Sequence, residues 1–178
     1  MSIEIVGSIA AGLLASSFAL IAFGADSFVE IISALIVLRH LNLDAAGSKA
    51  IGEKTALVTS LLLISIVPVV GIGSTYSFFV QNIHPDTSIL GIAIAAGAVV
   101  IMPILWKEKR KIGRETGCLP LSIDAMESAT CFLMSVALLA GLILEFVFHV
   151  GWFDYIATIV ILGFVAYEAK ESFDEARS

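Results

Sequence analysis

The basic residues of this chain are confined to alternate gaps between its apolar segments. All lysines and arginines fall in the gaps around residues 39–54 and 107–114 or in the C-terminal tail. They are Arg39, Lys49, Lys54, Lys107, Lys109, Arg110, Lys111, Arg114, Lys170 and Arg177. The other gaps, around Gly24 and at 74–88 and 148–154, contain none. This segregation is the positive-inside pattern of a multi-pass membrane protein, whose basic loops stay in the cytoplasm.

The composition also indicates a membrane protein. Hydrophobic residues make up 58% of the chain and charged residues 15%, whereas a soluble domain has about 25% charged residues. The 178 residues leave room for one compact bundle. We therefore expect an all-α polytopic membrane protein in the cell membrane, with residues 1–178 forming a single transmembrane domain. We expect no nucleic-acid partner.

A helix needs about 20 apolar residues to cross a bilayer. Four such spans are expected at about 55–79, 88–106, 119–148 and 153–169. The region from Ile3 to Leu41 is long enough for two more, with a turn either at Gly24–Ala25 or at Ser16–Ser17. This predicts a six-helix transmembrane bundle with both termini cytoplasmic. The basic run Lys107–Arg114 is expected to be a cytoplasmic loop that anchors the topology.

Carboxylates occur inside two of the expected spans. Asp26, Glu30 and Ser33 are separated by four and then three residues, which places them on one face of a helix. Ionisable residues inside a membrane are costly and usually mark a pathway or a site. A structural alternative exists for Asp26, which could cap a helix end if the turn lies nearby.

A second polar stripe lies in the fifth span. Its members recur at helical spacing, and they are Asp124, Glu127, Ser128, Cys131 and Ser135. In a bundle this small, the two stripes are expected to face each other. Carboxylate oxygens bind hard or borderline divalent cations, and a cysteine sulfur shifts the preference toward softer ions such as zinc. Alternatively, Asp124 interacts with the helix dipole, and Cys131 is a small core residue.

The sequence has no motif that indicates an enzyme. It lacks a glycine-rich phosphate loop, a His-Glu-x-x-His zinc motif and a Gly-x-Ser-x-Gly elbow. We therefore expect no catalytic activity and no cofactor. Glu145, near the far end of the fifth span, is a candidate for lining an exit path.

Three segments resemble the cation diffusion facilitator (cation efflux) family. Residues 16–30 resemble its second helix, where a GS-x-AL segment leads to two aspartates four residues apart; Asp26 and Glu30 stand at these positions. Residues 124–131 resemble the DA-x-H-x-x-x-D pattern of its fifth helix, with Glu127 and Cys131 at the ligand positions. Residues 151–154 resemble the GW-x-D start of its sixth helix. This resemblance places the first turn at Ser16–Ser17, with spans at about 3–16 and 18–41.

The resemblance implies a transmembrane domain without the family's C-terminal cytoplasmic domain. It implies export of a divalent, zinc-like cation from the cytoplasm by proton antiport, usually by a homodimer. Asp26, Glu30, Glu127 and Cys131 would bind the metal, and Asp124 would lie beside the site or on the path into it. The alternative is a non-transporting protein of the same fold that binds metal or a partner and modulates another complex.

Overall fold

The chain forms a bundle of long helices. The computed structural model describes residues 2–39, 45–81, 85–86, 88–117 and 119–175. This part of the chain is helical apart from short turns, and it contains no strand. The helices are α1 (Ser2–Ala15), α2 (Phe18–Arg39), α3 (Ala45–Tyr76) with a π-helical extension η1 (Ser77–Gln81), α4 (Ile89–Thr116), α5 (Leu119–Phe148) and α6 (Trp152–Glu175). The fold is therefore the all-α polytopic bundle that the sequence predicts.

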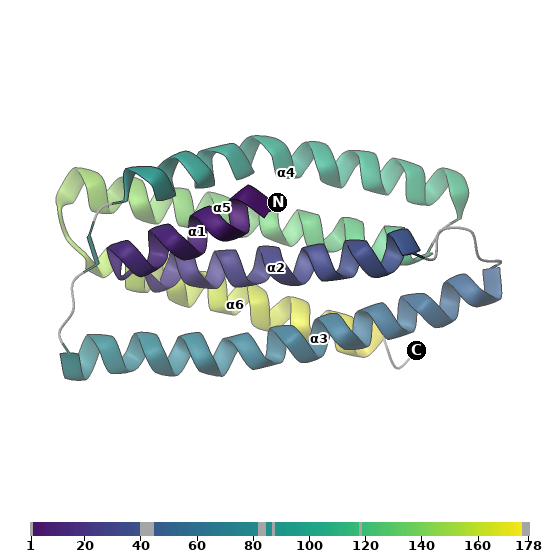
Figure 1. The fold of residues 1–178 in the computed structure, drawn as a ribbon, viewed down its shortest axis with the longest axis horizontal. Coiled ribbons are helices and arrows are strands. Elements are labelled where there is room, and N and C mark those ends of the chain that lie inside the picture. Colours follow the sequence, from purple (N-terminus) through teal and green to yellow (C-terminus); the bar gives the residue numbers. More distant parts are fainter. Residues whose placement is uncertain (1, 40–44, 82–84, 87, 118, 176–178) are drawn as a thin grey trace.

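Five of these helices are long and apolar enough to cross a membrane, and α1 is a shorter apolar helix. The helix axes are roughly aligned, and successive helices run in opposite directions (Figure 1). Helix α1 begins about halfway along the bundle. Large apolar side chains such as Leu61, Ile72 and Ile101 cover the outside. A hydrophobic exterior of this extent is suited to lipid rather than water.

The first turn lies at Ser16–Ser17, as the resemblance implies, and Gly24 is inside α2. Asp154 of α6 stabilises the start of α2. Its carboxylate accepts a hydrogen bond from the Ser17 hydroxyl at 2.5 Å and one from the Phe18 amide at 3.1 Å. The Ser17 oxygen in turn accepts from the Leu20 amide, so that two otherwise unpaired amides of the first turn are satisfied.

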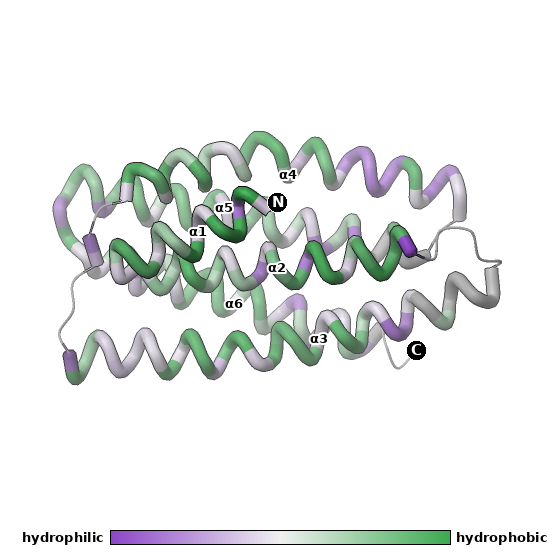
Figure 2. The backbone as a smooth tube through the Cα atoms, in the orientation of Figure 1, coloured by the Kyte–Doolittle hydropathy of each residue, from purple (hydrophilic) through white to green (hydrophobic). Residues whose placement is uncertain are grey.

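The basic run Lys107–Arg114 is helical rather than a loop. Helix α4 continues through it to Thr116, and Gly117 ends the helix in the left-handed conformation with φ 65°. Most residues of this segment are lysine, arginine or glutamate, which are good helix formers, and the helix continues through its one glycine, Gly113. The hydrophilic last turns of α4 lie at the same end of the bundle as the end of α2 (Figure 2), here called the basic end.

Candidate metal centre

Helix α2 carries buried acids at the centre of the bundle. It contacts α1, α3, α5 and α6, so much of its surface is covered by protein. Asp26, Glu30 and Ser33 all lie on buried positions, as does Ser27. Asp26 is inside a continuous helix, which excludes the capping role considered for it. The buried face of α2 therefore carries two carboxyl groups into the interior.

The polar stripe of α5 faces this side of α2. Asp124, Glu127, Ser128 and Cys131 are all buried, and α2 and α5 are in contact. The Ser128 hydroxyl donates a hydrogen bond of 2.5 Å to Glu30 Oε1. This contact shows that the two stripes face each other.

A lysine enters the same region from α4. Lys109 Nζ lies 3.2 Å from Glu30 Oε1 and 3.0 Å from Asp124 Oδ2. It also donates a hydrogen bond of 2.8 Å to the Ser128 oxygen. One ammonium group thus joins α2, α4 and α5. Lys109 belongs to the run expected to be a topology anchor, because spacing alone does not reveal which face of α4 turns inward.

The remaining predicted ligands lie around this network. The Cys131 thiol interacts with the Asp26 carboxyl group and is fully buried as a free thiol. Glu127 lies near Ser33 and Thr59, yet neither of its carboxyl oxygens has a hydrogen-bond partner among the described residues. A buried carboxyl group without partners is expensive, so Glu127 is suited to receive a proton or a cation.

Glu168 of α6 is a further buried acid that the sequence analysis did not single out. It lies close enough to Asp26, Glu30 and Glu127 to interact with them electrostatically. The sequence does contain a signal for it, namely a stripe at a spacing of three or four residues that predicts one helix face: Thr158, Ile161, Val165, Glu168 and Ser172. In the structure all five are buried. Glu168 therefore lies on the inward face of α6, with the apolar core positions.

The interior has many more negative than positive groups. Asp26, Glu30, Asp124, Glu127 and Glu168 could supply five negative charges, and Lys109 supplies one positive charge. If all were ionised, the site would carry four uncompensated negative charges. Among the described residues, however, no three histidine, cysteine, aspartate or glutamate side chains are arranged to hold a metal ion. The acids share a region but do not form a ready coordination shell in this conformation.

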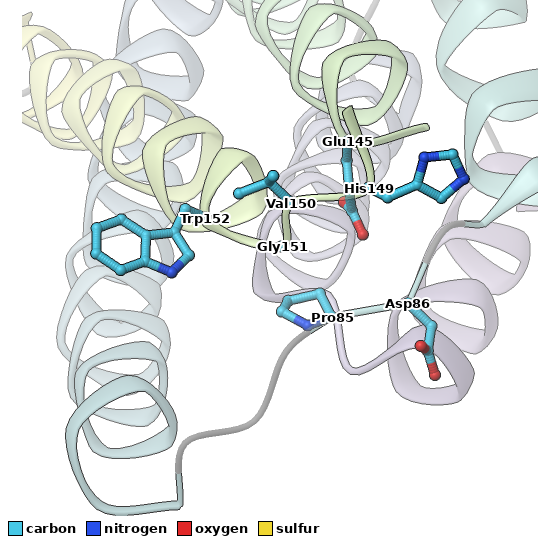
Figure 3. Close-up of a pocket in the computed structure, with 7 residues that line it drawn as sticks. All are labelled: Pro85, Asp86, Glu145, His149, Val150, Gly151 and Trp152. Atoms are coloured by element: carbon cyan, nitrogen blue, oxygen red, sulfur yellow. The ribbon is translucent and has the colours of Figure 1, made fainter. Parts of the chain in front are cut away.

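A separate pocket opens at the other end of the bundle. It has a volume of about 450 Å³ and lies between the end of α5, the start of α6 and the segment before α4. The buried carboxyl group of Glu145 points into the space beside Pro85 and Asp86, while the His149 ring turns away from it (Figure 3). Glu145 thus lines a pocket at the end opposite the basic end.

A model of the cation efflux transmembrane domain matches residues 2–178, almost the whole chain. A search among curated proteins found no match.

Proposed function

The chain belongs to the cation efflux family, and from this premise we propose that it exports divalent metal cations from the cytoplasm in exchange for protons. The family is one of transporters rather than enzymes. The apolar helices make the chain a multi-pass membrane protein.

The observation that carries the proposal is the excess of buried carboxyl groups between α2, α5 and α6. Unpaired charges are costly in a nonpolar interior. These groups must therefore be balanced by protons or by a cation. A divalent ion would replace protons at the same oxygens, so the same groups that bind the metal would also couple it to protons.

The proposed ligands are Asp26, Glu30, Glu127 and Cys131, with Asp124 on the path from the basic end. The carboxyl oxygens and one sulfur favour a borderline ion such as zinc. Because the ligands lie on α2 and α5, a small movement of one helix against the other would gather or separate them. The proposal includes a homodimer, as the family resemblance implies.

Metal flux into sealed proteoliposomes tests the proposal. We expect zinc or cadmium to enter vesicles that contain the protein, and Glu127→Gln to abolish this flux. Glutamine has nearly the same volume as glutamate but lacks the charge that binds the ion. Glu115→Gln is the matched control, because Glu115 is exposed near the end of α4.

The outcomes separate the two candidate functions. Normal flux in Glu127→Gln and Glu30→Gln would show that the buried site is wrong. Metal binding without flux in the unsubstituted protein would favour the non-transporting alternative, in which the same fold modulates another complex.

A further inference from the structure

Lys109 differs from the other basic residues of its helix. Lys107, Arg110, Lys111 and Arg114 are exposed, and their spacing of three, one and three residues places them on one face of α4. Lys109 lies off that face, and its side chain is 16% exposed. Four exposed cations are enough to anchor this helix end at a membrane surface. Lys109 is therefore not needed for that purpose.

The ammonium group of Lys109 sits on oxygens of the candidate metal centre. Its nitrogen lies within 3.2 Å of Glu30 Oε1 and within 3.0 Å of Asp124 Oδ2. Glu30 is a proposed ligand, and Asp124 lies on the proposed path from the basic end. A divalent cation on Glu30 would stand close to a like charge of Lys109. At such short distances, repulsion in a poorly screened interior is strong.

We propose that the Lys109 ammonium group competes with the metal for the candidate site. In the metal-free protein it binds Glu30 and Asp124, and it must leave both carboxylates when a divalent cation binds. This inference rests on the proposed function and adds that a side chain of the protein competes with the metal ion. In the empty state, the ammonium balances part of the buried negative charge. On metal binding, the Lys109 side chain would change rotamer and place its ammonium group in water at the basic end. Long basic side chains near helix ends commonly extend into water in this way.

Competition of this kind would select ions by charge. A sodium or potassium ion brings the same single charge as the ammonium group and gains little by displacing it. A divalent ion interacts about twice as strongly with the same carboxylates, because the Coulomb energy scales with charge. Lys109 would therefore exclude monovalent cations from the site but be displaced by divalent ones.

Affinity measurements on two lysine variants test the competition. Lys109→Gln removes the charge from the site, and Lys107→Gln removes the same charge from an exposed position of the same helix. We expect Lys109→Gln to bind cadmium or zinc about tenfold more tightly in calorimetry, because the site no longer has to be vacated first. Lys107→Gln should retain the affinity of the unsubstituted protein to within about twofold. Equal or weaker binding by Lys109→Gln would overturn the inference.

Amine labelling tests the displacement without any substitution. In the unsubstituted protein, saturating cadmium should raise the acylation of Lys109 relative to Lys107, as read by mass spectrometry of the labelled peptides. Unchanged labelling of Lys109 would overturn the inference even if Lys109→Gln proved unstable.

The two proposals can fail separately. Suppose that the unsubstituted protein binds metal, that Lys109→Gln binds it no more tightly, and that the acylation of Lys109 does not change. The metal site is then supported, and the proposed competition by Lys109 is wrong. If neither protein binds any divalent cation, both proposals are wrong. Binding seen in Lys109→Gln alone would support the competitor strongly.

Discussion

At the residue scale, Cys131 is the one sulfur among the proposed ligands. It is fully buried next to Asp26, and it occupies the α5 position where the family resemblance implies a ligand. The other proposed ligands, Asp26, Glu30 and Glu127, offer carboxyl oxygens. The single sulfur therefore distinguishes this site from one built of oxygen alone.

Replacing this sulfur should change ion preference rather than binding in general. We expect Cys131→Ser to weaken zinc and cadmium binding more than manganese binding, because thiolate prefers softer ions. Competition titrations with the three ions would measure the order of affinities. Cys118→Ser, which removes the other cysteine of the chain, is the control. An equal loss for all ions would show that Cys131 acts through packing.

Individual residues show what the sequence could and could not predict about the site. The spacing of Asp26, Glu30 and the α5 stripe was sufficient to predict two facing polar surfaces. It could not predict the neighbours of Lys109, because the direction of a side chain on α4 depends on how α4 packs against α5. Lys107 and Lys109 are two residues apart and have opposite environments for this reason.

At the scale of the elements, the short α1–α2 turn depends on a residue far away in the sequence. Asp154 of α6 accepts hydrogen bonds from Ser17 and from the Phe18 amide. It thereby fixes the start of α2, and so the depth at which Asp26 and Glu30 lie. The aspartate of the GW-x-D motif thus acts as a helix cap for α2.

Asp154→Ala should therefore reduce stability. It leaves a buried hydroxyl and an amide without their acceptor, which costs about 1–3 kcal/mol. We expect a lower thermal unfolding midpoint in detergent than for Asp174→Ala, which removes an exposed carboxylate from the same helix. Equal midpoints for the two variants would contradict the capping role.

The helix lengths show a second limit of prediction. Hydropathy identifies the segments that cross the membrane, but it does not detect where a helix continues beyond the membrane. Helix α4 extends to Thr116 through a charged segment whose residues favour helix. This extension is what places Lys109 on a rigid helix instead of a loop.

At the scale of the whole molecule, the bundle has two different ends. The described exposed basic residues of α2 and α4 lie at the basic end, whereas the pocket lined by Glu145 lies at the other. The positive-inside rule predicts that the basic end faces the cytoplasm. Metal would then approach the candidate site past Asp124 and Lys109.

Cysteine labelling of intact cells tests this orientation. In a background in which Cys118 and Cys131 are replaced by serine, we expect a membrane-impermeant maleimide to label Asp86→Cys in intact cells. Lys107→Cys should react only after permeabilisation, since both positions are exposed but lie at opposite ends. Labelling of both from outside would be incompatible with the proposed topology.

The central claim is that buried carboxyl groups exchange protons for a divalent cation, and a pH probe sealed inside proteoliposomes tests it most directly. When zinc is added outside, zinc should accumulate inside while protons leave, so the lumen should become more alkaline. The response should disappear in Glu127→Gln and persist in Glu115→Gln. Zinc accumulation with no change in luminal pH would contradict carboxylate-mediated exchange, and no zinc accumulation at all would contradict transport.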